Sequence, residues 1–272
     1  MTPDPASREI ERWSPTKWSE IAGNSGLIRV WLDFIRNSPC NTLVTGPRRS
    51  GKTRTILHGI KSLLCKLRSD SLDPCGLCRS CQAVDAILDE HTGLFRELAG
   101  NDFGFVPVDC QNISAEQLRA LRDKAGWDDE RCIYYLDEIA ALGANGRDKV
   151  ILKPLDEWPC VWIASAVTVN RRDGRGKKHQ KDGLSPDVRS RFAQKVGTTL
   201  PTPSELTKWI KDRCREEEWN IHIEQEERTI PLLIKRARYR VGFVKQPIAV
   251  AAARGRLLTL DLVRDFNFEA LE

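Results

Sequence analysis

Two patterns of apolar positions alternate along the first 200 residues: short apolar runs and apolar residues at helical spacing. Four short, mostly apolar runs predict buried strands, at residues 41–45, 106–109, 132–137 and 161–165. Helices are predicted at 28–35, where apolar residues show helical spacing, from the end of the glycine-containing segment 46–53 through Leu67, and from Ser114 to about Lys124. Strands that alternate with helices are typical of a parallel α/β sheet.

The pattern changes near Pro201–Pro203. From Thr202 onward we expect no strand, and helices are predicted at Pro203–Glu218 and Glu224–Tyr239, with shorter ones toward Phe268. The sequence therefore predicts an α/β domain over residues 1–201 and a small all-helical domain over 202–272.

Composition narrows the class of protein. Of the 272 residues, 40% are hydrophobic and 30% charged, which is typical of a chain with a packed core and not of a disordered one. The chain has no run of 18 apolar residues, so we expect no membrane span, and Met1–Ser14 is too polar for a signal peptide. A cytoplasmic location is the expectation.

The net charge of +5 is concentrated in one segment. Residues 171–183 hold six Lys and Arg against two Asp, a net charge of +4, while the other 259 residues carry +1. With three glycines and no large apolar side chain, this segment is expected to be a mobile surface loop. We expect it to contact DNA through the phosphate backbone without reading sequence; a solubilising insertion is the alternative.

Nine cysteines, an odd number with no secretory signal, indicate a reducing compartment. Four are clustered, and their two-residue gaps suit the thiolates of a structural zinc site: Cys65, Cys75, Cys78 and Cys81. An iron–sulfur cluster and a metal-free group of thiols remain as alternatives. The other five cysteines are expected to be small core residues.

A complete phosphate-binding motif, G-x-x-x-x-G-K-[ST], lies between a predicted strand and a predicted helix. In this motif backbone amides face the phosphates, Lys52 reaches the β- and γ-phosphates, and the Thr53 hydroxyl binds Mg²⁺. The loop residues assigned to ATP are Gly46, Pro47, Arg48, Arg49, Ser50, Gly51, Lys52, Thr53 and Arg54.

Two carboxylates end the predicted strand at 132–137. We expect Asp137 to act on Mg²⁺ through water, and Glu138 to orient and polarise the water that attacks ATP. Together with the phosphate loop they predict an ATPase.

These motifs resemble the AAA+ ATPases of the clamp-loader branch, especially the bacterial DNA polymerase III gamma/tau and delta-prime subunits. The resemblance runs through about residues 13–262, and the cysteine cluster after the phosphate-loop helix is its most discriminating feature. It implies that the segment Trp13–Gly23 packs against adenine, with Trp18, Ile21 and Ala22 as the contacts. From the residues alone, the two tryptophans of this segment are equally expected to attach an N-terminal arm to the core, and both roles are compatible. The resemblance also implies an AAA+ domain with an inserted zinc segment at about 65–81, followed by a helical lid.

The same resemblance assigns further roles. Leu184–Phe192 is similar to a family motif whose arginine reaches the γ-phosphate of a neighbouring subunit, so Arg191 is the expected trans-acting arginine. An arginine that only pairs with a surface carboxylate is the alternative. Lys245 stands where the family has an arginine that binds nucleotide, and Ala166 stands where it has a polar residue that senses the γ-phosphate; Ser165, Thr168 or Asn170 are possible substitutes. A basic helix with Arg119, Arg122 and Lys124 is expected to face DNA or to be a solvated face.

The resulting expectation is a cytoplasmic, ATP-hydrolysing, clamp-loader-like protein that acts in DNA replication or repair, with ATP, Mg²⁺ and Zn²⁺ as cofactors. Its expected partners are DNA, other AAA+ subunits in a homo- or hetero-oligomer, and a sliding clamp, polymerase or helicase. The family's C-terminal collar is not expected after the lid, so a ring would be held by the ATPase domains or by another chain. The alternatives are a helicase loader, a mobile-element or phage ATPase, and a nucleotide-binding scaffold with little hydrolysis.

Overall fold

The computed structural model describes residues 13–89, 104–125, 132–143, 147–157, 159–172, 178–181, 184–216 and 219–271. Contacts along the chain divide these residues into two compact units. One unit holds residues 26–47 and 55–198, and the other holds the segment up to Ser25, the segment Arg48–Arg54 and the residues from Thr199 onward.

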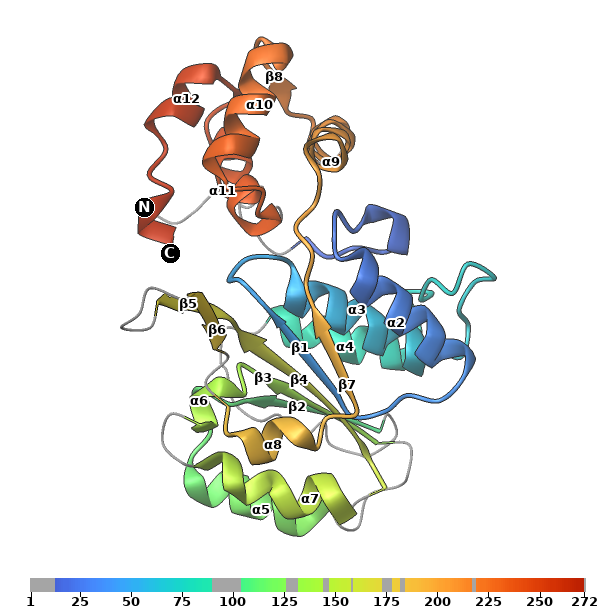
Figure 1. Ribbon diagram of the computed structural model, residues 1–272. Coiled ribbons are helices and arrows are strands. Elements are labelled where there is room, and N and C mark those ends of the chain that lie inside the picture. The colour runs from blue at the N-terminus through green and yellow to red at the C-terminus, as the bar shows by residue number, and fades with distance from the viewer. Residues whose placement is uncertain are drawn as a thin grey trace. The chain divides into compact units, whose positions relative to one another are not determined.

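A five-stranded parallel sheet forms the centre of the first unit (Figure 1). Its order is β2-β3-β4-β1-β7, and every pair of neighbours is parallel. The strands span Thr42–Gly46 (β1), Phe105–Asp109 (β2), Ile133–Asp137 (β3), Val161–Val167 (β4) and Gln194–Gly197 (β7). The four strands expected from the apolar runs are present, and β7, whose residues are mostly polar, is an edge strand that the pattern did not reveal.

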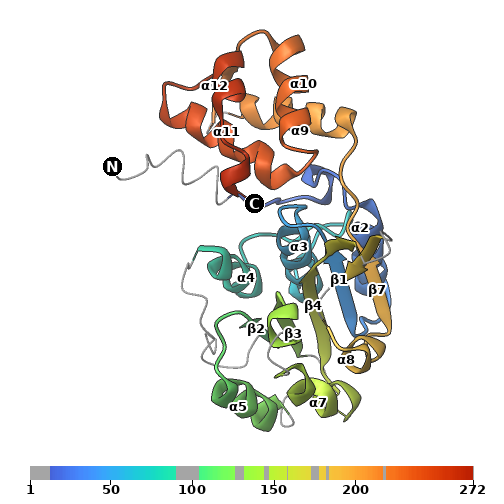
Figure 2. The ribbon, with the colours of Figure 1, turned by 60° about the vertical axis from the view of Figure 1, so that its left-hand side comes forward.

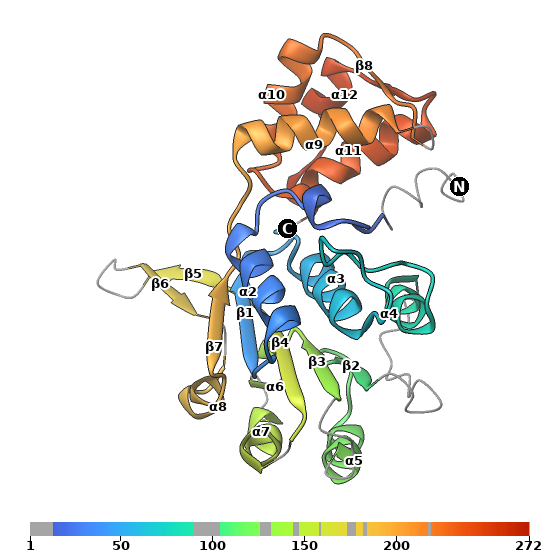
Figure 3. The same cartoon turned by 90° about the vertical axis from the view of Figure 1, so that its right-hand side faces the viewer.

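Helices cover both faces of this sheet, as parallel strands with two apolar faces require (Figures 1 and 3). On one side lie α2 (Ser25–Arg36), α3 (Lys52–Leu64) and α4 (Arg79–Asp89). On the other lie α5 (Ala115–Ala125), α7 (Leu152–Glu157) and α8 (Pro186–Ser190). Shorter helical turns are η1 (Trp18–Glu20), α6 (Ala140–Gly143) and η2 (Arg147–Ile151).

Side chains alternate between the two faces along the strands. Leu136 of β3 and Ala164 and Ala166 of β4 belong to the buried cluster that also contains Leu118 of α5 and Val188 of α8. The intervening residues of the same strands therefore point to the opposite face. This alternation decides which polar side chains can meet at the carboxyl end of the sheet.

The basic segment 171–183 is not the structureless loop expected from its composition. Val169–Arg172 (β5) and Lys178–Lys181 (β6) pair as an antiparallel two-stranded sheet, with Arg171 opposite His179. The pairing needs only backbone groups, so a sequence without apolar side chains still forms it. Residues 173–177 and 182–183 lie outside the described part.

The second unit is built mainly from α9 (Pro203–Arg215), α10 (Glu226–Arg236), α11 (Val241–Ala253) and α12 (Leu260–Asp265), with a final turn η3 (Glu269–Leu271) (Figure 2). The all-helical expectation is wrong in one respect, because His222–Ile223 (β8) pairs in parallel with Leu257–Leu258 (β9). Two residues per strand are too few for a period to be seen in the sequence.

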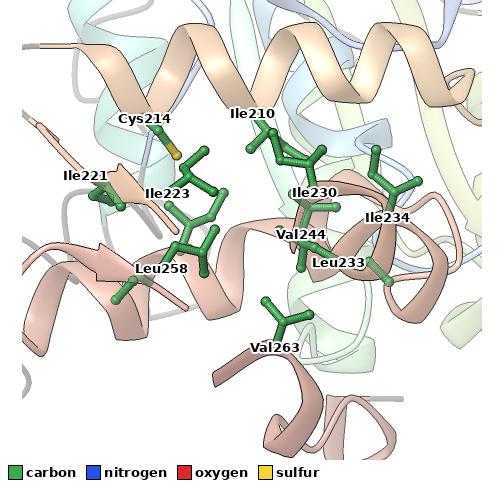
Figure 4. Packing of buried hydrophobic residues seen from close by; sticks show 14 of the residues in the cluster. Ile210, Cys214, Ile221, Ile223, Ile230, Leu233, Ile234, Val244, Leu258 and Val263 are labelled. Atoms are coloured by element: carbon green, nitrogen blue, oxygen red, sulfur yellow. The ribbon is translucent and has the colours of Figure 1, made fainter. Parts of the chain in front are cut away.

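One apolar core holds this unit together. Ile210 and Cys214, one turn apart on α9, point toward apolar side chains of α10, α11 and α12 (Figure 4). Ile223 and Leu258 of the two short strands close the same cluster. Thr202 caps α9, since its hydroxyl accepts from the backbone N–H of Glu205 at 3.2 Å, and so fixes where the helix begins.

Candidate functional site

The phosphate loop joins the end of β1 to the beginning of α3, as the motif requires. A Cβ at Gly46 would lie 1.7 Å from Oγ1 of Thr198, so no side chain fits at the first glycine. Gly51 has φ +87°, a conformation that disfavours residues with a side chain. Both motif glycines therefore have a steric reason to be glycine.

Two carbonyl groups of the loop are fixed by hydrogen bonds. The carbonyl of Arg49 accepts from the N–H of Gly242 at 3.1 Å, and that of Ser50 accepts from Nδ2 of Asn24 at 3.0 Å. In a trans peptide the C=O of one residue and the N–H of the next point in opposite directions. The N–H groups of Ser50 and Gly51 are thus turned away from Gly242 and Asn24, in the manner of an anion-binding loop.

The lysine of the motif is buried. Lys52 is 5% exposed, and it begins α3, where the positive end of the helix dipole favours a bound anion. The neighbouring Thr53 is half-buried. Arg54 donates to the hydroxyl of Ser14, so its head group is engaged by the N-terminal segment.

The two predicted carboxylates lie at the carboxyl end of β3. Oδ1 of Asp137 accepts a hydrogen bond from the hydroxyl of Ser165 at 2.6 Å and another from that of Tyr135 at 2.7 Å. Glu138 follows with φ +52°, and its N–H donates to Oγ of Ser165 at 3.0 Å. The carboxyl ends of parallel strands share one edge, so Asp137 and Gly46 lie at the same edge of the sheet, separated by β4.

These residues fit Mg²⁺ and a nucleotide by their chemistry. A hydroxyl and a carboxylate are the hard oxygen donors that Mg²⁺ prefers, and Thr53 and Asp137 supply them. No described residue donates to Oδ2 of Asp137, so this is the oxygen that would face a metal ion or a metal-bound water. A bound Mg²⁺ would neutralise charge on the phosphates, and Glu138 would be the group that accepts a proton from water.

The residues assigned to adenine and to the lid lie in the second unit. Trp18 is buried, and Ile21 and Ala22 are half-buried. Lys245 is also buried; its Nζ donates to the carbonyl of Trp13 at 3.2 Å and lies 5.7 Å from the Trp13 ring. The cation at this position is therefore held against the N-terminal segment.

Arg191 follows α8 and is one-third exposed. Its Nε donates to both oxygens of Asp156 at 3.2 Å, and Nη1 donates to the carbonyl of Asp187 at 2.8 Å. In the isolated chain this arginine is paired with a carboxylate of its own subunit.

The methyl group of Ala166 is fully buried in the apolar cluster that also contains Leu118 of α5 and Val188 of α8. The neighbouring Ser165 points to the other face of β4 and reaches Asp137. Tyr135 is a functional candidate that the motif did not assign, and its two-residue spacing from Asp137 on the same strand was the available signal. Ser165 was predicted only as a possible substitute for Ala166, and its contact with Asp137 depends on the register of β3 and β4. Thr168 is half-buried, and the side chain of Asn170 lies outside the described part.

The four clustered cysteines come together at the end of α3 and the start of α4. Their sulfurs all lie within 4.8 Å of one another, with separations of 3.4 Å (Cys78–Cys81), 3.9 Å (Cys65–Cys78) and 4.0 Å (Cys75–Cys81). Four sulfurs about 2.3 Å from a tetrahedral zinc ion are about 3.8 Å apart. The cluster thus has the dimensions of a thiolate zinc site.

Backbone amides point at these sulfurs, as metal-thiolate loops require. The N–H of Cys75 donates to Sγ of Cys65, and the N–H of Cys78 donates to Sγ of Cys75, both at 3.3 Å. The amides of Cys78 and Leu77 lower the pKa of the Cys75 thiol to about 6, whereas burial raises the pKa values of Cys65 and Cys81. Gly76, at φ +73°, makes the turn between Cys75 and Cys78.

The features expected to contact DNA are only partly described. Arg119 is exposed on α5, while the side chains of Arg122 and Lys124 and those of the 171–183 segment lie outside the described part. Among the described residues, no helix has the length and apolar character needed to span a membrane.

Comparison with known proteins supports the fold. No family model and no curated protein matches the chain. A variant of RuvB from Thermotoga maritima aligns with 94% of this chain and 71% of its own length, at 15% identity and a TM-score of 0.58. The RuvB structure described as a Holliday junction branch migration motor aligns over the same shares at 14% identity and a TM-score of 0.55. At these identities the comparison shows that the chain shares the fold of the RuvB structures.

Proposed function

We propose that the chain is an ATP-binding and ATP-hydrolysing AAA+ protein of the clamp-loader type, acting on DNA together with other AAA+ subunits. The observation that carries the proposal is the loop at residues 46–53. Its carbonyls at Arg49 and Ser50 are bonded to Gly242 and Asn24, which turns its amides to the opposite side, beside a buried Lys52.

The carboxyl end of β3, which carries Asp137 and Glu138 and is called the carboxylate edge below, supports hydrolysis of ATP rather than binding alone. Asp137 is oriented by two hydroxyls, and Glu138 follows it directly. The scaffold alternative rested on Ala166, but Ser165 supplies a polar group at the adjacent position. Hydrolysis is therefore the better-supported function.

The proposed DNA-related activity rests on two observations. One is the charge of +4 over residues 171–183, and the other is the fold shared with RuvB, a branch migration motor. The cysteine cluster, with the dimensions of a zinc site, favours the clamp-loader branch within that fold. The alternative functions, a helicase loader and a mobile-element or phage ATPase, would use the same nucleotide site and would differ only in the protein or DNA on which the chain acts.

The test is ATP turnover by the purified chain, alone and with primed DNA. We expect turnover that Lys52→Ala abolishes together with ATP binding, because the lysine is the principal cation of the loop. Lys208→Ala, which removes an exposed lysine of α9, is the matched control and should behave as wild type. Undiminished ATP binding by Lys52→Ala would contradict the proposal.

A further inference from the structure

The hydroxyls of Tyr135 and Ser165 converge on one oxygen of the candidate metal-orienting carboxylate. Tyr135 and Asp137 are two residues apart on β3 and share a face. Leu136 pairs with Ala164, so the register brings Ser165, the next residue of β4, beside Asp137. Both hydroxyls donate to Oδ1, at 2.7 and 2.6 Å.

This arrangement saturates one oxygen of Asp137 and not the other. A carboxylate oxygen has two lone pairs, and Oδ1 accepts two hydrogen bonds. The carboxylate plane is therefore fixed, and Oδ2 is the oxygen left for a metal ion. Hydrogen bonds from hydroxyls to a carboxylate are short and strong, so they resist rotation of the group.

Ser165 also connects the two carboxylate residues. Its Oγ accepts from the N–H of Glu138 at 3.0 Å while its proton is donated to Asp137. Its carbonyl accepts from the N–H of Ile139 at 2.9 Å. The side chain is fully buried, and Glu138 is held at φ +52°, a backbone conformation that a residue with a Cβ rarely adopts without such support.

We infer that Tyr135 and Ser165 are positioning residues, which hold Asp137 so that Oδ2 faces Mg²⁺, and that Ser165 additionally sets the direction of Glu138. This inference rests on the proposed ATPase function. It goes further because it assigns the hydroxyls of Ser165 and Tyr135 to the orientation of the carboxylate that would bind Mg²⁺. Tyr135 acts on Asp137 alone, whereas Ser165 acts on both carboxylates.

The roles of Tyr135 and Ser165 predict different losses of Mg²⁺ affinity and of turnover. For Tyr135→Phe we expect the Mg²⁺ concentration that half-saturates nucleotide binding to rise roughly 10-fold, since one charge-assisted hydrogen bond is lost. For Ser165→Ala we expect a similar rise and a further fall in kcat of roughly 10-fold, with the KM for ATP little changed. Ser165→Thr, which keeps the hydroxyl, should restore most of both.

The experiment measures binding of a fluorescent ATP analogue by the full chain across a Mg²⁺ titration, and turnover separately. Tyr134→Phe is the matched control, because Tyr134 lies on the same strand but faces the opposite side, stacked on Trp162. Thermal unfolding of each variant separates positioning from stability: a merely structural role lowers the unfolding temperature without moving the Mg²⁺ midpoint.

An unchanged Mg²⁺ midpoint in both Ser165→Ala and Tyr135→Phe would overturn the inference. A wild-type chain that binds Mg²⁺ and nucleotide but never hydrolyses it would overturn the ATPase function alone, and the midpoints would still decide the positioning role. A wild-type chain that binds no nucleotide would overturn both.

Discussion

The cysteine cluster and the carboxylate edge of the sheet are assembled in opposite ways. The four sulfurs come from residues 65–81, a single stretch that follows α3 and includes the first turn of α4, and amides of the same stretch point at them. Asp137 is instead held by Ser165, 28 residues away on a neighbouring strand. The first arrangement depends on a local loop and the second on the register of the sheet.

This difference teaches which forces maintain each site. The loop between α3 and α4 exposes Leu67 and Leu77 to solvent, so little apolar burial holds it. An ion pair of 2.6 Å between Lys61 and Asp85 connects the two helices. The sheet edge, by contrast, ends two strands whose central residues are all buried. We therefore expect the fold of the cysteine cluster to depend on a bound metal, and the placement of the carboxylates to depend on the packed core.

The largest effect is expected from removing the metal. Thiolate zinc sites in small peptides contribute about 10–16 kcal/mol, so a chelator or Cys78→Ser should release zinc and open the 65–81 segment. Amide hydrogen exchange should become fast there while the strands of the sheet keep their protection. Zinc should also leave as the pH falls, because its thiolate ligands become protonated.

Cys40→Ser, which alters a half-buried cysteine outside the cluster, is the control and should retain one zinc ion per chain. Purified protein that contains no metal, or iron with visible absorption, would contradict a zinc site. That result would not change the assignment of the carboxylate edge, because different contacts hold the two regions.

Arg191 gives the next largest expected effect. If it completes a neighbour's site, Arg191→Ala should lower turnover by the assembled protein roughly 10³-fold and leave ATP binding intact. Asp156→Asn removes only the carboxylate that pairs with it, and a partly exposed ion pair contributes about 0–1 kcal/mol, so that variant should change turnover by no more than about 5-fold. Equal turnover by Arg191→Ala and wild type would refute a shared site.

The smallest effect concerns the basic segment. Replacing its six Lys and Arg with serine should weaken DNA binding and make the salt dependence shallower by about 3.6 in log–log slope, if four phosphates are contacted. ATP binding should not change. The same salt slope before and after replacement would show that the segment only solubilises the chain.

The sequence predicted the elements whose residues carry a strong local pattern. The runs ending in Gly46 and Asp137 became strands because their residues are buried on both faces, and the cysteine spacing predicted a cluster that is present. Edge strand β7 was missed because its residues are mostly polar, and the pair β8–β9 was missed because two residues per strand are too few to show a period.

The role of Ser165 could not be read from a motif. Ala166 and Ser165 are neighbours, and only the face of β4 on which each lies decides that the serine reaches Asp137. The pairing of Arg191 with Asp156 likewise depends on tertiary packing between α7 and α8. Spacing within one element is visible in a sequence, whereas register between elements is not.

The most direct test of ATP hydrolysis at the carboxylate edge is the state of bound nucleotide in Glu138→Gln. Because this variant keeps the phosphate loop and Asp137 but loses the group that accepts a proton from water, hydrolysis should slow roughly 10²–10⁴-fold. After incubation with ATP and Mg²⁺, wild type should hold ADP and the variant should hold intact ATP. Equal conversion to ADP by the two proteins would contradict the assigned site.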